Sequence, residues 1–198
     1  MATRPPFVFE LKVVLRDTQP PIWRQIHVSS TTTLAKLHRV LQVTMGWTDS
    51  HLHEFDYHGA KYGVPDPEYD APVVNERSVR LDALLHLPNE VLTYLYDFGD
   101  SWEHSVILER ISQPVPGRRY PLCVAGDLRC PPEDCGSTPG YYGLLEALAD
   151  RRHEQHEELL TWVGGRFDPA EFSPELVTRQ LHSGWPPREF PKGVRAQR

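Results

Sequence analysis

The sequence predicts a single α+β domain in which helices pack mainly on one face of an antiparallel sheet. Short runs that alternate apolar and polar residues come first along the chain, and this period of two indicates strands. Runs with helical spacing dominate the later part of the chain. The 198 residues are enough for one buried core and do not require a second domain.

The first strands and the first helix have the clearest patterns. Residues 7–15 and 22–28 alternate, and a proline-containing break at residues 17–21 separates them, so we expect an antiparallel pair. Threonines at positions 31–33 supply a helix N-cap. Apolar residues then recur at helical spacing up to Met45, and Gly46 closes this helix.

The remaining elements are shorter. We expect a strand at residues 51–57, a loop at 60–77, a short strand or helical turn at 78–87, a hairpin that pairs 94–97 with 102–108, helices at 141–149 and 153–163, and a last helix capped by Ser173 and running through Leu181. Residues 113–139 have no periodicity, and a connection of this length is usually functional or held by something other than packing.

The domain is assigned to residues 1–187. Residues 188–198 form a basic tail that contains proline and lacks apolar periodicity. We expect this tail to be disordered and dispensable for folding.

The hairpin carries the most informative motif, Tyr94-Leu-Tyr-Asp-Phe-Gly-Asp-Ser-Trp-Glu-His104. Its turn brings together four ionisable side chains and a tryptophan, namely Asp97, Asp100, Trp102, Glu103 and His104. Functional residues gather at such strand ends. The alternative is that the two aspartates only accept hydrogen bonds from turn N–H groups, and that the histidine is an ordinary residue of the rim.

Two histidines of the preceding predicted strand suggest a metal site. His51 and His53 are two residues apart, so both imidazoles should point to the same face. Zinc or another divalent metal would need a further ligand. Asp97, Asp100, Glu103, His104, Glu133 or Asp134 could supply it. Alternatively, the histidines face solvent or bond to a neighbouring strand.

Three cysteines lie in the aperiodic stretch. Cys123, Cys130 and Cys135 have spacings of six and four intervening residues, which are not those of a typical zinc knuckle, although His153 and His156 could complete a structural zinc site. The alternative is that they are small buried residues. Their odd number also argues against a disulfide framework.

Glu133 and Asp134 follow two prolines, so their carboxylates sit in a rigid turn. They could pair with an arginine or cap the next helix, or they could join His104 in an acid–base set. Trp47 and Trp102 stand beside polar candidate residues and could line a groove, although core packing is the usual role of tryptophan.

Charge and hydropathy restrict the partners. The net charge of −6 argues against general binding of duplex DNA, which would require a basic face. The sequence has no apolar run near the roughly 20 residues of a membrane span, and its start lacks a signal-peptide core. We therefore expect a cytoplasmic protein without a membrane partner and with reduced thiols.

The hairpin motif resembles the signature of the plasmid pRiA-type ORF-three-like family, which also includes transposon passenger proteins with a resolvase-like label. Further matching segments lie at residues 21–24, 37–38, 45–55, 131–136, 140–141, 167–169 and 172. The resemblance implies a compact α+β domain and no settled activity. Gly136-Ser137 departs from the Gly-Gly that the family often has there, and the nucleophilic serine among arginines that a resolvase needs is missing.

Two functional hypotheses follow. The first is a binding or interaction module with an acidic, His- and Trp-lined cleft for a protein or peptide of basic character, with a conceivable link to mobile genetic elements. The second is a metal-dependent hydrolase or nuclease that uses the His and Asp cluster. Both require Asp97, Asp100 and His104 to lie close to His51 or His53, where the carboxylates would raise the pKa of His104.

Overall fold

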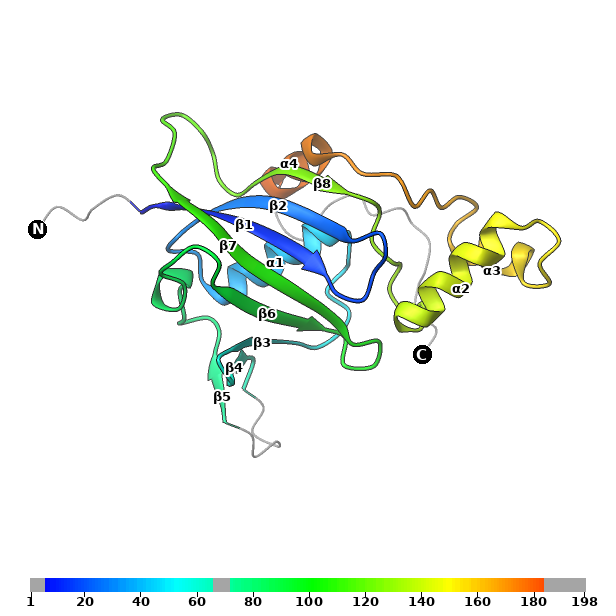
Figure 1. Ribbon diagram of the computed structural model, residues 1–198, viewed down its shortest axis with the longest axis horizontal. Helices are drawn as coiled ribbons and strands as arrows, with labels where there is room; N and C mark the ends of the chain where they lie inside the picture. The colour runs from blue at the N-terminus through cyan, green and yellow to red at the C-terminus, as the bar shows by residue number, and fades with distance from the viewer. Residues whose placement is uncertain (1–5, 66–71, 184–198) are drawn as a thin grey trace, which may run out of the picture.

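The computed structural model describes residues 6–65 and 72–183, so the predicted tail at 188–198 lies outside the described residues. Figure 1 shows one large sheet with helix α1 across one of its faces. The elements are β1 (Val8–Leu15), β2 (Ile22–Ser29), α1 (Leu34–Met45), β3 (His53–Tyr57), β4 (Ala60–Gly63), β5 (Val73–Asn75), the 3-10 helix η1 (Leu81–Ala83), β6 (Val91–Tyr96), β7 (Trp102–Ser112), β8 (Leu122–Asp127), α2 (Ser137–Ala149), α3 (His156–Trp162) and α4 (Pro174–Ser183).

The eight strands form one sheet in the order β5-β4-β3-β6-β7-β1-β2-β8. All neighbours are antiparallel except β4 and β5, which are parallel. This confirms the α+β prediction. The predicted hairpin is present, with Tyr96 opposite Trp102 and Tyr94 opposite His104.

Two predicted loops contain strands. Residues 60–77 include β4 and β5, and the aperiodic stretch 113–139 includes β8. These three strands have only three to six residues and lie toward the two edges of the sheet, so backbone pairing to a neighbour defines them more than an apolar pattern does. The predicted strand at 51–57 also begins later, at His53.

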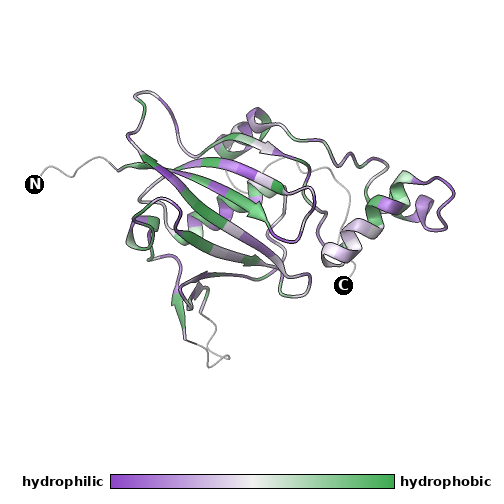
Figure 2. Ribbon diagram, in the orientation of Figure 1, coloured by the Kyte–Doolittle hydropathy of each residue, from purple (hydrophilic) through white to green (hydrophobic). Residues whose placement is uncertain are grey.

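The core lies between α1 and the sheet face that α1 covers. Strand residues such as Leu11, Val13 and Ile26 are completely buried, and so are Leu34 and Leu37 of α1. The predicted caps of α1 are confirmed, because the Thr33 side chain accepts from the Lys36 N–H and Gly46 closes the helix at a φ of +85°. Along the strands, hydrophobic and hydrophilic residues alternate (Figure 2), as a sheet with one covered face requires.

The other helices lie around this unit. Helix α4 packs beside β8 and α1, and Ser173 accepts from the Leu176 N–H as its predicted cap. Helices α2 and α3 contact each other and extend away from the sheet (Figure 1). Tyr142 of α2 bonds to the backbone of Gln19, which ties α2 to the β1–β2 turn. Within the described ranges, no helix has the length and apolar character needed to cross a bilayer.

A buried arginine connects the pieces of this fold. Arg24 of β2 is 1% exposed, and its guanidinium donates to the carbonyl oxygens of Thr44 (2.8 Å) and Asp127 (2.8 Å). It also stacks on the ring of Phe172, 4.0 Å from the centroid. One side chain therefore joins α1, β2, the end of β8 and the segment that leads into α4.

We predict that Arg24→Met lowers the free energy of unfolding by about 2–4 kcal/mol, because it leaves buried carbonyl groups without donors. Arg16→Met is the matched control. The Arg16 side chain is 40% exposed and pairs with Glu103 at the surface, so its loss should cost less than about 1 kcal/mol. Urea unfolding of both variants measures the difference, and equal losses would contradict the connecting role of Arg24.

Candidate functional site

Three segments that are far apart in sequence converge at the tip of the β6–β7 hairpin. His51 precedes β3, Asp97 follows β6, and Asp134 lies in the loop before α2. His51 Nε2 is 3.6 Å from Asp97 Oδ2 and 3.2 Å from Asp134 Oδ1, and one donor atom from each residue lies within 4.8 Å of the others. We call His51, Asp97 and Asp134 the rim cluster.

Turn chemistry orients Asp97. Its backbone has a φ of +57°, and its Oδ1 accepts hydrogen bonds from the N–H groups of Gly99 (2.9 Å) and Asp100 (3.3 Å). The expected turn role is therefore present for one oxygen, while the other faces His51. Asp97 is also 7% exposed, so its carboxylate is held in place rather than free to rotate in solvent.

Two further predicted residues hold the loop against the hairpin. Glu133 accepts from the Thr48 N–H (3.2 Å) and from the hydroxyl of Tyr96, and Asp100 Oδ2 accepts from the Gly136 N–H (3.1 Å). Both carboxylates are structural here, but with other partners than expected, because among the described residues Glu133 contacts no arginine and Asp100 accepts from the loop before α2 rather than from its own turn. These contacts place Asp134, which has a φ of +60°, beside His51. Non-glycine residues at positive φ are costly and gather where function requires a fixed geometry.

The rim cluster is enclosed on one side and open on the other. The His51 ring packs edge-on against Tyr96, with centroids 5.8 Å apart. Its Nε2 is inaccessible to solvent and has no partner in hydrogen-bond geometry within the described part of the chain, although two carboxylates are near it. The Asp134 side chain is 57% exposed, so a ligand can approach from that side.

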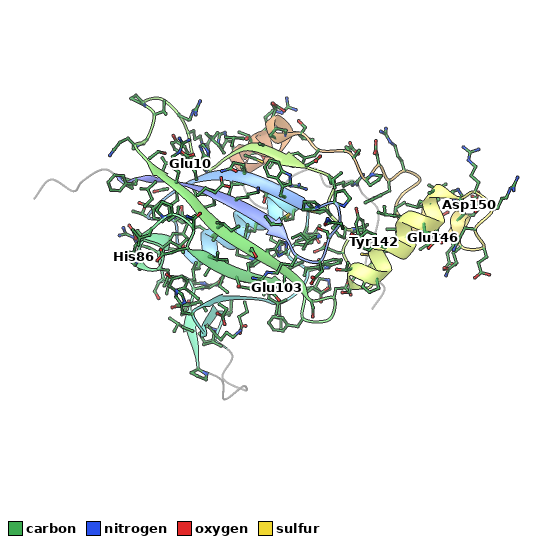
Figure 3. All side chains as sticks on the ribbon, viewed as in Figure 1. Glu10, His86, Glu103, Tyr142, Glu146 and Asp150 are labelled. Atoms are coloured by element: carbon green, nitrogen blue, oxygen red, sulfur yellow. The ribbon has the colours of Figure 1, made fainter. Side chains whose placement is uncertain are left out.

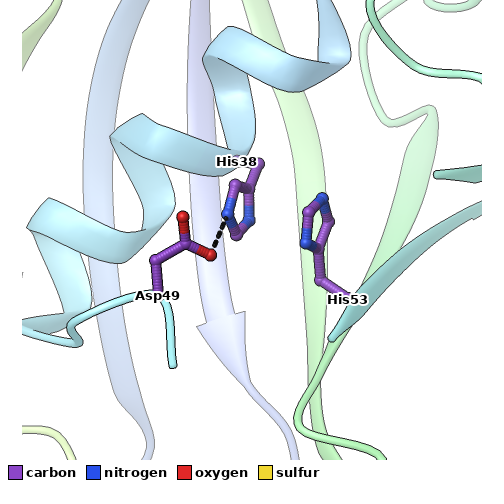
Figure 4. Close-up of side chains that lie close together, drawn as sticks. All are labelled: His38, Asp49 and His53. Atoms are coloured by element: carbon purple, nitrogen blue, oxygen red, sulfur yellow. Dashed lines mark hydrogen bonds and ion pairs between the residues drawn. The ribbon is translucent and has the colours of Figure 1, made fainter. Parts of the chain in front are cut away.

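His53 belongs to a different group, which we call the buried His pair. Its ring stacks on His38 of α1, with centroids 3.5 Å apart and an interplanar angle of 5° (Figure 4). His38 Nε2 is 2.9 Å from Asp49 Oδ1, and His53 Nε2 is 2.8 Å from Glu76 Oε2. The expectation that His51 and His53 serve one metal was wrong, because His51 lies in the bend before β3 and joins the rim cluster instead.

Burial determines the pKa of two histidines, His104 of β7 and His38 of α1. His104 is fully buried, and its Nδ1 is 3.2 Å from the Tyr94 carbonyl oxygen. Desolvation lowers its pKa to about 4, so the predicted raised value was wrong, and His104 does not join the acid cluster. Burial and the neighbouring His53 likewise lower the pKa of His38 to about 4.

Strand alternation separates the remaining hairpin residues. Trp102 is buried and its ring lies 6.3 Å from that of Trp47, so it is a core residue. Glu103 points to the opposite face of β7 (Figure 3), where it pairs with Arg16 and is not part of the rim cluster.

The cysteines have separate environments. Cys123 Sγ lies 3.6 Å from the Ala125 carbonyl oxygen, Cys130 is buried beside Arg24, and Cys135 is partly exposed. Burial raises the pKa of Cys123 to about 11 and that of Cys135 to about 12, which keeps both thiols protonated. Across residues 6–65 and 72–183, no group with metal-binding spacing contains a cysteine, so the predicted cysteine zinc site is not assembled there.

A groove of about 500 Å³ lies between α2 and α3 and reaches Asp134. Its lining includes both apolar side chains and carboxylates, among them Leu144, Leu159, Trp162, Asp134, Glu146 and Glu158. Glu146 lies on the outer part of α2 (Figure 3).

Comparison with known proteins finds a matching family model, a sequence relative and a structural neighbour. A family model described as plasmid pRiA4b ORF-3-like protein matches residues 7–176, which confirms the resemblance drawn from the motifs. The uncharacterized protein y4hQ of Sinorhizobium fredii is 44% identical over 158 residues, covering 79% of this chain and 81% of the relative. The crystal structure of the protein of unknown function MM3350 from Methanosarcina mazei Go1 has a TM-score of 0.81 and 38% identity, covering 87% of this chain and 98% of that chain.

The low pKa values of His104 and His38 predict that the protein loses stability in acid. In the unfolded chain each of these two histidines takes up a proton near pH 6.5, whereas in the folded chain it does so only near pH 4. Stability contributed by neutral His104 is thus complete above pH 6.5 and is lost as the pH falls toward 4, by up to about 3 kcal/mol.

Urea unfolding at several pH values measures this loss. His104→Phe keeps an aromatic ring of similar size and should flatten the pH dependence between pH 6.5 and 4. A ring-proton NMR titration that gives His104 a pKa above 6.5 would contradict the assignment.

Proposed function

This chain belongs to the plasmid pRiA4b ORF-3-like family, and we propose that it is a binding module whose rim cluster holds a divalent metal ion. The convergence of His51, Asp97 and Asp134 carries this proposal. Metal–ligand bonds of about 2.1 Å at tetrahedral or octahedral angles separate neighbouring donor atoms by about 3.0–3.4 Å. The separations of 3.2 and 3.6 Å around His51 Nε2 are close to these values.

The donor set suggests which ions would bind. One imidazole nitrogen and two carboxylate oxygens suit zinc, manganese or ferrous iron better than calcium, which prefers oxygen ligands alone. The two carboxylates supply the charge that a divalent ion requires. The N–H groups that bind Asp97 Oδ1 fix the other oxygen toward the site, as hydrogen bonds to ligand carboxylates do in known metal centres.

The groove beside the rim cluster suggests the partner. Asp134, Glu146 and Glu158 give it negative charge, and Leu144, Leu159 and Trp162 offer apolar contact. A cytoplasmic protein or peptide segment with basic and apolar side chains would complement this lining. Direct binding of duplex DNA is not favoured, in view of the net charge of −6.

A metal-dependent hydrolase is the second candidate function. Three protein ligands leave coordination positions for water, and the exposure of Asp134 makes such positions accessible. A hydrolase would also need a general base near the ion. His104 is unsuitable because it is fully buried in the core, so a binding role is the better supported of the two.

Metal titration tests the proposed site. The wild-type chain should bind Zn²⁺ or Mn²⁺ in isothermal titration calorimetry, and Asp97→Asn and Asp134→Asn should each weaken binding at the rim at least tenfold. Asparagine tolerates positive φ and can accept the same turn hydrogen bonds, so these variants remove charge with little effect on the backbone.

Asp82→Asn is the control, because Asp82 is an aspartate outside the rim cluster that pairs with Arg80. Affinities that are the same in all four proteins would contradict a metal site at the rim.

Peptide titration tests the groove separately. A synthetic peptide that combines lysine and leucine should shift the backbone NMR signals of Leu144, Leu159 and Trp162. The double variant Glu146→Lys and Glu158→Lys should lose this response, whereas Glu54→Lys, on the sheet, should keep it. Shifts spread over the sheet instead of the groove would contradict the proposed partner surface.

A further inference from the structure

The buried His pair contains a second set of metal-binding atoms, separate from the rim cluster. Donor atoms of His38, Asp49 and His53 all lie within 4.8 Å of one another, and Glu76 Oε2 is 2.8 Å from His53 Nε2. We propose that these residues form a second site for a divalent transition metal, mostly buried and open on the Asp49 side. His38, Asp49 and His53 would be its ligands, and Glu76 would be the adjacent carboxylate.

The elements that supply the four residues make this a connecting site. His38 comes from α1, Asp49 from the loop after α1, His53 from the start of β3, and Glu76 from the residue after β5. An ion held by His38, Asp49 and His53 would link α1 and the loop after it to β3.

Burial and charge favour an ion at this position. The side chains of His38, His53 and Glu76 are 5%, 9% and 4% exposed, whereas that of Asp49 is 36% exposed, so the group is buried except on the Asp49 side. Each ring nitrogen faces a carboxylate oxygen, because Asp49 Oδ1 is 2.9 Å from His38 Nε2 and Glu76 Oε2 is 2.8 Å from His53 Nε2. A carboxylate removed from water is unfavourable unless a positive charge lies beside it. A divalent ion would supply that charge.

The surrounding hydrogen bonds already orient His38 as a ligand. Tyr94 OH is 2.8 Å from His38 Nδ1 and 3.0 Å from Gln42 Nε2, while Gln42 Oε1 accepts from the Asp49 N–H at 2.9 Å. With the His38–Asp49 contact, these bonds close a ring of four residues. The tyrosine hydroxyl can accept as well as donate, so Nδ1 can carry the proton while Nε2 is presented to a metal.

The parallel rings set one structural requirement. The nitrogen lone pairs of two stacked imidazoles lie in parallel planes, so they do not both point at one ion. Binding must therefore rotate at least one ring out of the 5° stack seen in Figure 4. This rotation makes metal binding visible in spectra of the two histidines.

The test uses Zn²⁺ and the double variant Asp97→Asn and Asp134→Asn, which disables the rim cluster while leaving the buried His pair intact. One equivalent of Zn²⁺ should move the Nε2 signals of both His38 and His53 in ¹⁵N NMR to values typical of metal coordination. The His153 signals serve as the internal control. If the Nε2 signals of His38 and His53 stay unchanged with excess Zn²⁺, the second site is excluded.

Stoichiometry separates the two proposals. If both hold, the wild-type chain binds two Zn²⁺ ions, the rim double variant binds one, and His53→Gln binds one. If the wild-type chain binds Zn²⁺ and the rim double variant binds none, the second site is overturned and the proposed function stands. If the wild-type chain binds one Zn²⁺, the rim double variant still binds it, and His38 and His53 show coordination, the rim site is overturned and the second site stands.

Discussion

Two buried tyrosine hydroxyls on β6 organise both groups of ionisable residues. Tyr94 and Tyr96 are two residues apart, so both rings point to the covered face of the sheet, where each is completely buried. A hydroxyl that is removed from water needs hydrogen-bond partners in the protein. Tyr94 finds them in His38 and Gln42 of α1, and Tyr96 finds them in Glu133 and the Ser50 N–H.

These bonds position the candidate ligands on either side of the tyrosines. The Tyr94 contacts fix His38 next to Asp49 and thereby hold the buried His pair. The Tyr96 contact with Glu133 draws the loop before α2 onto the hairpin and brings Asp134 to His51. Burial raises the pKa of both phenols, so both hydroxyls stay protonated at any physiological pH. The rim cluster thus lies at the end of β6, and the buried His pair lies beside the middle of the same strand.

Local patterns predicted the parts of this arrangement that depend on local physics. Alternation predicted β1, β2 and the hairpin. Capping residues predicted both ends of α1 and the start of α4, because neighbouring residues decide these features. The convergence of the hairpin with His51 could also be expected, because crowded carboxylates need a histidine, an arginine or a metal to balance their charge. Strand β8 could not, because its position depends on pairing with β2 across nearly a hundred residues.

The role of His38 could not be predicted, because it is a lone histidine within an apolar helix face and only a three-dimensional contact reveals its partner. The pKa of His104 was predicted wrongly, because the alternation that makes it a strand residue also buries it. Burial lowers its pKa more than the nearby acids could raise it.

The proposed metal site depends on the end of β6, where His51, Asp97 and Asp134 meet. Anomalous diffraction from crystals grown with Mn²⁺ tests this most directly. A peak bonded to His51 Nε2, Asp97 Oδ2 and Asp134 Oδ1 at about 2.1–2.2 Å is the expected result. A fully refined rim cluster without such a peak at millimolar Mn²⁺, with His51 bonded directly to a carboxylate, would contradict the account.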